Sequence, residues 1–261
     1  MKLIKACAAC ALPMLIAACG GGGGGGGVNT GPVSTPPPAP VVGAAQGIYI
    51  GTTNDGREVD TIVLDNDQFY TMYGNTVGSA FQVSGFVQGD GKSNNGSFTS
   101  ANAVDSTALN TRVAATVNAT YTPGLNLNGS LVESAGTVTF NSAPISSAVI
   151  NYNSPASLAS IAGKWNLTSL RGFATALNIG ATGVLTGTSS GCIINGSITP
   201  RAAGKNVFDV SIDFGPAPCL IPNQNIKGIA VEYLLTSGQR QLIVAGIDST
   251  RFNTAAFFGV R

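Results

Sequence analysis

VFDVSIDF, residues 207–214, is the stretch that decides the fold class. Apolar and polar side chains alternate along it without interruption. The apolar members are Phe208, Val210, Ile212 and Phe214, and the polar members are Asp209, Ser211 and Asp213. A period of two places successive side chains on opposite faces of a β-strand, so this stretch predicts a half-buried strand. We expect the face that carries Asp209 and Asp213 to be solvated.

Shorter stretches with the same alternation occur elsewhere, at residues 81–87, 138–140 and 242–244. Clusters of turn-forming residues separate them. These clusters are Asn54-Asp55-Gly56, Gly89-Asp90-Gly91, Asn94-Asn95-Gly96, Thr122-Pro123-Gly124 and Ser237-Gly238. Short strands divided by turns at this spacing are typical of antiparallel sandwiches and barrels. The chain is therefore predicted to be all-β.

The two halves of the chain resemble each other weakly. Gly47-Ile48-Tyr49 is similar to Gly163-Lys164-Trp165, and Gly129-Ser130-Leu131-Val132-Glu133 is similar to Gly228-Ile229-Ala230-Val231-Glu232. We therefore predict two small antiparallel β-barrel-like domains in tandem, at residues 46–154 and 155–261. Residues 151–155 would form the break, and residues 156–161 a short helical turn. One continuous sandwich or larger barrel is the alternative.

The first residues have the composition of an export signal. Lys2 and Lys5 precede an uncharged apolar stretch, residues 6–18. This stretch is shorter than the roughly 20 residues of a membrane-spanning helix and has the length of a signal-peptide core. It ends in Leu15-Ile16-Ala17-Ala18-Cys19, which resembles the lipobox of bacterial lipoproteins.

The lipobox resemblance implies a signal peptide of residues 1–18, cleavage before Cys19 and attachment of lipid to Cys19. Gly20 follows where an Asp would imply retention in the inner membrane, so the resemblance implies the outer membrane and leaves its face undecided. An ordinary secretory signal with a cysteine near the cut is the alternative.

Residues 19–45 are predicted to form a flexible tether behind the lipidated cysteine. Gly20 to Gly27 are an unbroken glycine run, and five prolines follow between Pro32 and Pro40. Glycine loses much backbone entropy on ordering, and proline-rich segments favour an extended chain, so neither part can build a core.

A stretch of the second half resembles the opening of the calycins, the lipocalin and avidin group of barrels. It consists of residues 158–165 (LASIAGKW), 176–179 (ALNI) and 183–187 (GVLTG). The resemblance implies that Trp165 closes the floor of a barrel and that Arg251 or Arg261 packs on its ring. Trp165 would either fill the barrel end or line a ligand pocket. It is the only tryptophan, which argues against a biotin pocket.

Cys192 and Cys219 are the only cysteines left in the predicted globular part. An envelope compartment beyond the inner membrane is oxidising, so we predict a disulfide between them. A redox-active pair is the alternative, although no C-x-x-C spacing is present.

No catalytic residue, metal ligand or cofactor is predicted. The chain has no histidine, which removes the usual base of serine and cysteine hydrolases and most zinc sites. Asp65-Asn66-Asp67 is the nearest approach to a calcium loop but lacks its later acidic ligand, so a turn is the simpler interpretation. Removal of residues 1–18 leaves 11 basic residues against 12 acidic ones, and without a basic patch no nucleic-acid partner is expected.

Aromatic side chains gather in one predicted strand of the first half. Phe69, Tyr70 and Tyr73 lie beside Met72, and a period of two turns some of them outward. They form either an exposed patch for a partner or glycan, or part of the core.

These features together predict a membrane-anchored lipoprotein that acts as a non-enzymatic binding or interaction module at the cell envelope. Its partner would be an unknown protein, a glycan or a small apolar ligand. The alternatives are a structural or assembly lipoprotein that docks on an outer-membrane protein, and a hydrolase that uses carboxylates alone.

Overall fold

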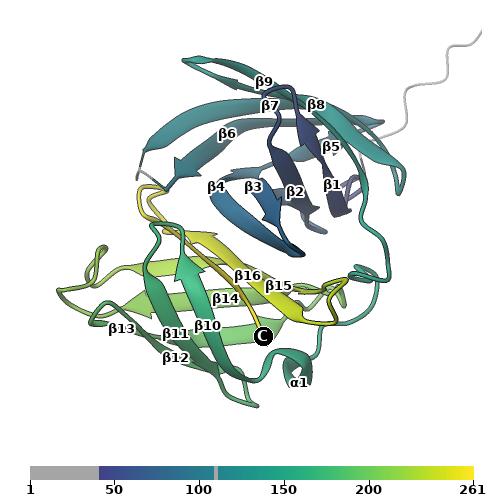
Figure 1. Cartoon of the computed structure of the whole chain (residues 1–261). Coiled ribbons are helices and arrows are strands. Elements are labelled where there is room, and N and C mark those ends of the chain that lie inside the picture. Colours follow the sequence, from purple (N-terminus) through teal and green to yellow (C-terminus); the bar gives the residue numbers. More distant parts are fainter. Residues whose placement is uncertain (1–40, 109–110) are drawn as a thin grey trace, which may run out of the picture. The chain divides into compact units, whose positions relative to one another are not determined.

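The structure, a computed structural model, describes residues 41–108 and 111–261 (Figure 1). Within these residues the chain forms seventeen strands and one short helix, so the all-β prediction is confirmed. The predicted signal peptide, Cys19 and most of the predicted tether lie outside the described residues. Among the described residues, no helix has both the length and the hydropathy needed to cross a bilayer.

The first nine strands form one antiparallel sheet. They are β1 (Gly47–Thr53), β2 (Glu58–Val63), β3 (Gln68–Val77), β4 (Ala80–Asp90), β5 (Lys92–Asn94), β6 (Ser97–Thr107), β7 (Arg112–Thr122), β8 (Asn126–Glu133) and β9 (Gly136–Pro144). Sheet order is β4-β3-β2-β1-β9-β8-β7-β6-β5. β4 also pairs with β6, with Val87 opposite Asp105. This pairing closes eight of the strands into a barrel, which we call barrel 1, and leaves β5 as a short extra strand.

The remaining strands follow the helix α1 (Leu158–Ile161) and close into a second barrel, barrel 2. They are β10 (Gly163–Ser169), β11 (Ala174–Ile179), β12 (Val184–Ser189), β13 (Cys192–Pro200), β14 (Phe208–Phe214), β15 (Asn225–Leu234), β16 (Arg240–Ile247) and β17 (Thr254–Val260). Each strand pairs with its neighbour in sequence, and β17 returns to pair with β10. The chain therefore forms two closed barrels in tandem, and the predicted helical turn precedes the second.

The stretch that decided the fold class is β14. Phe208, Val210 and Ile212 are buried inside barrel 2, and Phe214 packs at the edge of the same core. Side chains fill the interior of an eight-stranded barrel, so alternate residues of every strand point into it. The opposite face is solvated as predicted, since Asp213 is exposed and the Asp209 side chain is 45 % exposed. Asp209 also forms an ion pair with Arg201 (2.6 Å), which the loop after β13 carries to this face.

Strands β2–β4 and β15–β17 are buried on both faces, since the outer faces of the two barrels share a third apolar core. Met72 and Phe86 of barrel 1 belong to this core together with Ile243 and Phe258 of barrel 2. Both barrels fall in one compact unit. Gln241 links them further, because its side chain accepts a hydrogen bond from the Phe81 amide (3.1 Å) and donates one to the Phe81 carbonyl (2.6 Å).

This shared core decides the position of the aromatic side chains in β3. Phe69 and Tyr73 point into barrel 1, while Tyr70 and Met72 point outward into the shared core. All four are buried. The interpretation of these residues as core is thus confirmed, and the exposed patch does not form, because the second barrel covers the outward face.

The predicted disulfide joins Cys192 at the start of β13 to Cys219 in the loop after β14. The two cysteines lie 27 residues apart in sequence, and closing a loop of that length contributes roughly 3.5 kcal/mol of stability in the loop-entropy model. The bridge ties this loop to the end of barrel 2.

Candidate functional site

Each barrel is closed at one end by the segment that precedes its first strand. In barrel 2 the Trp165 indole nitrogen donates to the carbonyl of Ile161 (2.7 Å), four residues earlier in α1. In barrel 1 the Tyr49 hydroxyl donates to the carbonyl of Ala45 (3.1 Å), also four residues earlier. Both rings are almost fully buried. The similarity between residues 47–49 and 163–165 therefore reflects the same floor in both barrels.

The second repeat predicted from the sequence is not equivalent in the two barrels. Residues 129–133 lie in β8, which is the seventh of the eight closing strands of barrel 1, whereas residues 228–232 lie in β15, the sixth of barrel 2. Gly129 and Gly228 share only one feature, the close approach of a neighbouring strand. In each, an added Cβ would meet the backbone of the neighbouring strand within 2.5 Å, so both positions need a glycine.

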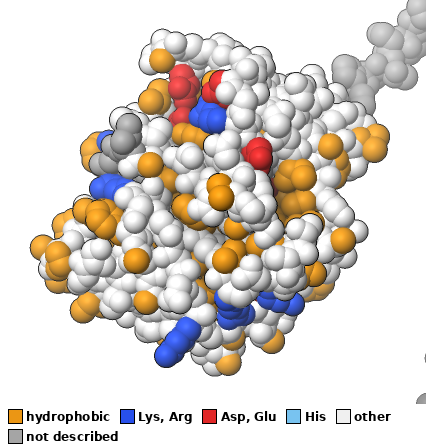
Figure 2. Space-filling view, viewed as in Figure 1, with side chains coloured by type: hydrophobic (Ala, Val, Ile, Leu, Met, Phe, Trp, Pro, Cys, Tyr) orange, Lys and Arg blue, Asp and Glu red, His pale blue; other side chains and the backbone are white. Residues whose placement is uncertain are grey.

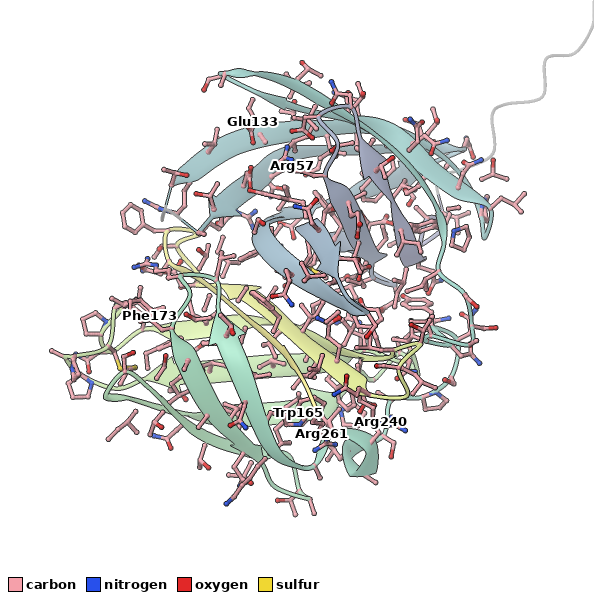
Figure 3. The ribbon with its side chains drawn as sticks, viewed as in Figure 1. Arg57, Glu133, Trp165, Phe173, Arg240 and Arg261 are labelled. Carbon is pink, nitrogen blue, oxygen red and sulfur yellow. A yellow bond between two sulfur atoms is a disulfide. The ribbon has the colours of Figure 1, made fainter. Side chains whose placement is uncertain are left out.

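The structure decides between the two arginines predicted to pack on Trp165. The Arg261 guanidinium lies 4.0 Å from the centre of the indole ring and donates to the carbonyls of Ala162 (2.8 Å) and Ser160 (2.6 Å) (Figure 3). Arg251 instead reaches barrel 1, where it donates to the carbonyls of Gln88 and Asn102. The floor of barrel 2 is thus sealed by α1, one tryptophan and the last residue of the chain.

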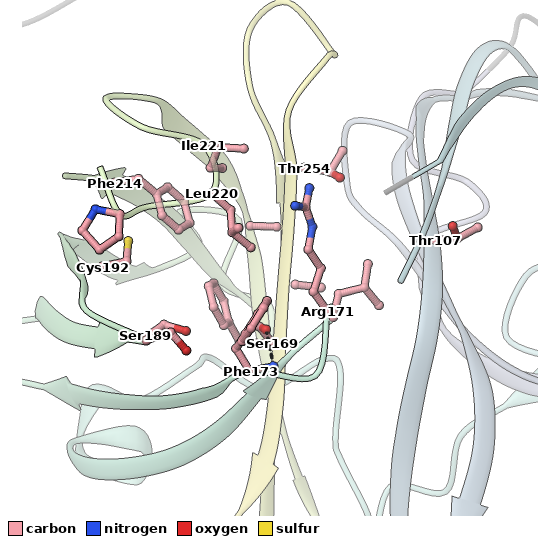
Figure 4. A pocket seen from close by; sticks show the side chains of 16 residues that line it. Thr107, Ser169, Arg171, Phe173, Ser189, Cys192, Phe214, Leu220, Ile221 and Thr254 are labelled. Atoms are coloured by element: carbon pink, nitrogen blue, oxygen red, sulfur yellow. Dashed lines mark hydrogen bonds between the residues drawn. The ribbon is translucent and has the colours of Figure 1, made fainter. Parts of the chain in front are cut away.

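The opposite end of barrel 2 holds an apolar pocket of about 180 Å³ (Figure 4). β10 leads to it from the floor, since Trp165 lies near the start of this strand and Ser169 at its end. Phe173, Phe214 and Phe257 supply the aromatic part of the lining. The aliphatic part comes from Leu170, Leu220, Ile221, Pro218, Ala255 and Ala256, and the Cys192–Cys219 bridge adjoins it. We call this the mouth pocket.

The rim of the mouth pocket combines exposed apolar groups with a few polar ones. Phe173 is 39 % and Leu220 55 % exposed. The Ser169 hydroxyl accepts a hydrogen bond from the Phe173 amide (3.0 Å), which holds the β10–β11 turn against the pocket. Burial lowers the pKa of Arg171 in the same turn. A polar fringe around an apolar hollow is the usual design of a site for small molecules.

Barrel 1 has a cavity of its own that the sequence did not reveal. It contains the carboxyl groups of Asp105 and Glu133 beside Tyr73 and Arg57. Burial raises the pKa of Asp105, and burial together with the neighbouring Asp105 raises the pKa of Glu133 to about 7. A carboxyl at an inward position of an alternating strand, as Asp105 is in β6, was the available signal.

A further carboxyl, that of Asp60 in β2, is buried where the two barrels meet. Its side chain is 6 % exposed and faces Tyr233 of β15, which is 4 % exposed. Burial raises the pKa of Asp60 to about 7, although the Tyr233 hydroxyl lowers it in part. Within the described part of the chain, Oδ1 of Asp60 has no hydrogen-bond partner of good geometry.

The candidate calcium loop is a turn. Residues 65–67 connect β2 to β3, and Asp67 accepts hydrogen bonds from the amides of Gly43 and Ser93, both at 3.0 Å. Asp65 forms an ion pair with Arg201 (2.5 Å) and so links the barrels. In residues 41–108 and 111–261, no three Cys, Asp or Glu side chains are grouped as a metal site would require.

Cys19, the predicted lipid-bearing residue, lies outside the described residues. Residues 41–45 of the predicted tether are described, and Ala45 is buried in the core of barrel 1.

Comparisons of the chain with protein-family models, with curated proteins and with solved structures give no match.

Proposed function

We propose that this chain is a lipid-anchored, non-enzymatic binding protein of the bacterial envelope whose mouth pocket holds a small apolar ligand. The observation that carries the proposal is the asymmetry of barrel 2. One end is sealed by Trp165, Arg261 and α1, whereas the other end presents an apolar hollow with a polar fringe. Such a barrel admits a ligand from one side only.

The size and lining of the mouth pocket set the class of ligand. A dry apolar cavity of about 150 Å³ is large enough for a benzene molecule, so about 180 Å³ suits a single aromatic ring or a short branched chain. Three phenylalanine rings favour an aromatic ligand, because offset or edge-on aromatic pairs gain about 1 kcal/mol beyond burial. Arg171, Ser169 and Thr254 at the fringe would orient a polar substituent.

A relation of barrel 2 to the calycins is part of the same proposal. The G-x-W step of residues 163–165, with an arginine from the chain end on the indole ring, supports a relation of barrel 2 to the calycins. The lack of histidine supports a non-enzymatic role. The pair Asp105 and Glu133 does not favour a glycoside hydrolase, because these carboxyls hydrogen-bond each other, whereas glycosidases hold theirs about 5 Å or more apart.

We expect the double variant Phe173→Ala/Leu220→Ala to bind fluorobenzene at least tenfold more weakly than the wild type. Both side chains cover the mouth pocket and are partly exposed, so their truncation removes apolar contact without opening the core. Titration followed by ¹⁹F NMR measures the affinity. Val184→Ala is the matched control, since Val184 is an exposed apolar residue of barrel 2 outside the pocket lining. Equal binding by the double variant and the wild type would exclude the mouth pocket as the site.

The anchor is tested separately from the ligand. We expect mass spectrometry of the mature protein to show an acylated Cys19 at the amino terminus, and we expect Cys19→Ser to leave the membrane fraction, because two or more acyl chains are what hold such a protein to a bilayer. An unmodified amino terminus, or a serine variant that still fractionates with membranes, would contradict the lipid anchor. Neither result would bear on the mouth pocket.

A further inference from the structure

Barrel 1 contains a cavity of about 170 Å³ with a mostly apolar wall and a charged end. The apolar wall consists of Val59, Phe69, Val87, Phe98, Val117, Leu127, Leu131, Val138 and Phe140. Its far side is closed by the floor around Tyr49. The other end of the cavity is accessible from solvent, because the residues there are only partly buried: Glu133, Val138 and Phe140. A hollow of this size and lining accepts a single ring or a short alkyl chain.

Four polar side chains converge on the charged end from three strands and one turn. The Tyr73 hydroxyl of β3 donates to Oδ1 of Asp105 in β6 (2.8 Å), and Glu133 at the end of β8 hydrogen-bonds Asp105. Arg57, just before β2, places its guanidinium 4.5 Å from the centre of the Tyr73 ring. Arg57 and Glu133 lie together at this end of barrel 1 (Figure 3), where acidic and basic side chains meet on a surface with few charges (Figure 2).

The backbone around this group makes room for Tyr73. Gly85 of β4 lies opposite Tyr73, and a Cβ at Gly85 would fall 2.1 Å from the Tyr73 hydroxyl. The ring therefore crosses the neighbouring strand only because that position is a glycine. A register shift after Tyr73 turns the strand at the same point. The sequence thus positions one hydroxyl directly on Asp105.

The charges at this end do not balance. Two carboxyls can hydrogen-bond each other only through a shared proton, so the pair of Asp105 and Glu133 carries one negative charge while it holds that proton and two once the proton has left. Apart from such a proton, Oε1 of Glu133 is buried without a donor among the described residues. Arg57 compensates the pair only in part: its charge lowers the pKa of both carboxyls, but its guanidinium also binds a third carboxylate, that of Asp55, through Nη2 (2.7 Å) and Nε (3.1 Å). An anionic ligand would be repelled here, and a cationic one attracted.

We propose that the cavity of barrel 1 is a second ligand site, which takes a small apolar molecule carrying a protonated amine. The apolar body fills the barrel, and the ammonium group donates to Asp105 and Glu133 in place of their shared proton, which leaves to solvent. The titratable and charged groups that face the ammonium are Arg57, Tyr73, Asp105 and Glu133, on β3, β6, β8 and the turn before β2. This site is distinct from the mouth pocket, although Thr107 at the end of β6 lines both.

Benzylamine and benzyl alcohol, titrated into the full-length protein by calorimetry, test the proposal, because they have the same shape and differ in charge. At pH 8 we expect benzylamine to bind at least tenfold more tightly than benzyl alcohol. At pH 5 the preference should disappear, since the carboxyl pair then keeps its proton. Titrations at pH 6.5 in two buffers of different ionisation enthalpy should show the release of between half a proton and one proton per benzylamine bound.

Two glutamine variants separate the site from general charge effects. Glu133→Gln should lose the preference for benzylamine at every pH, while Glu58→Gln, on the same barrel but outside the cavity lining, should keep it. Phe173→Ala/Leu220→Ala should also keep it, because the mouth pocket is a different site. Equal affinities for the two probes at pH 8, or an unchanged preference in a folded Glu133→Gln, would overturn the proposal. If Glu133→Gln does not fold, the proton release of the wild type decides, and its absence counts against the site.

Discussion

Between pH 4 and pH 8 the wild-type protein is expected to lose about 4 kcal/mol of unfolding free energy relative to Asp60→Asn. Asp60 lies where the two barrels meet, and burial raises its pKa from 3.8 to about 7. Each unit of difference between the folded and unfolded pKa is worth about 1.4 kcal/mol. An asparagine has nearly the same shape and cannot ionise, so it avoids this cost.

The sign follows from proton uptake. Because the pKa of Asp60 is higher in the folded state, the folded protein binds more protons than the unfolded chain between pH 3.8 and pH 7. The contribution of Asp60 to the stability of the protein therefore falls as the pH rises through this range, and it stays constant above the range. Tyr233→Phe should move the upper limit of this range to higher pH, since the hydroxyl lowers the pKa of Asp60.

Denaturant unfolding of the wild type and Asp60→Asn at several pH values measures the difference. Asp248→Asn provides a control of opposite sign. Burial alone would raise the pKa of Asp248, but hydrogen bonds from Asn253 and Thr250 lower it, so this variant should cost stability at neutral pH and lose that effect on acidification. If the difference in unfolding free energy between wild type and Asp60→Asn is the same at pH 4 and pH 8, ionisation of Asp60 does not destabilise the folded protein.

Replacing Trp165 with alanine is expected to destabilise the protein by about 4 kcal/mol, as is usual for removal of a fully buried large aromatic side chain. The ring is 1 % exposed and occupies the floor of barrel 2 among Ile161, Leu167 and other core residues. Its loss also removes the donor to the Ile161 carbonyl and the surface on which Arg261 lies. Unfolding of this variant must be monitored by circular dichroism, because the variant lacks the only tryptophan and with it the usual fluorescent probe.

Two milder variants separate the contributions at the floor. Trp165→Phe keeps most of the apolar volume but loses the indole donor, so we expect a cost of about 1–3 kcal/mol. Arg261→Ala should cost about 1 kcal/mol, since a cation–π contact near the surface contributes little more. Binding of fluorobenzene in the mouth pocket should persist in both, because the floor is the opposite end of the barrel. A fully stable Trp165→Ala would mean that the floor is not part of the cooperative core.

The two barrels have floors of the same construction, which the weak similarity between the two halves of the sequence indicated only in part. Tyr49 and Trp165 each start a barrel, and each bonds a carbonyl four residues before it. In both barrels the cavity opens at the end opposite this aromatic residue. A shared construction of this kind leaves a cavity at the other end of each barrel, and only the cavity of barrel 1 is lined by carboxyl groups.

Local pattern was sufficient to predict strands and turns. β14 alternates as predicted because a barrel strand has one face toward the interior, and most of the predicted clusters lie between strands, as residues 54–56 do. The cluster at residues 89–91 is an exception, because β4 continues to Asp90 and only Gly91 lies between it and β5. The pairing of Cys192 with Cys219 also followed, since no other cysteine remained in the predicted globular part. Local pattern failed at β16, where Ile243 and Ala245 are as deeply buried as Leu242 and Val244. Alternation disappears there because both faces of the strand are covered.

Residue order alone determined that this chain is all-β, that it has two halves, and that an aromatic residue after a glycine begins each of them, because these features depend on side-chain period and turn chemistry within a few neighbouring residues. Which faces are covered, which arginine lies on Trp165 and which carboxyls meet were decided only by the tertiary structure. Asp105 and Glu133 are 28 positions apart in the sequence, and closure of the barrel brings them within hydrogen-bonding distance. Burial then sets their pKa values, and burial is a property of the packed barrels, which no short stretch of sequence contains.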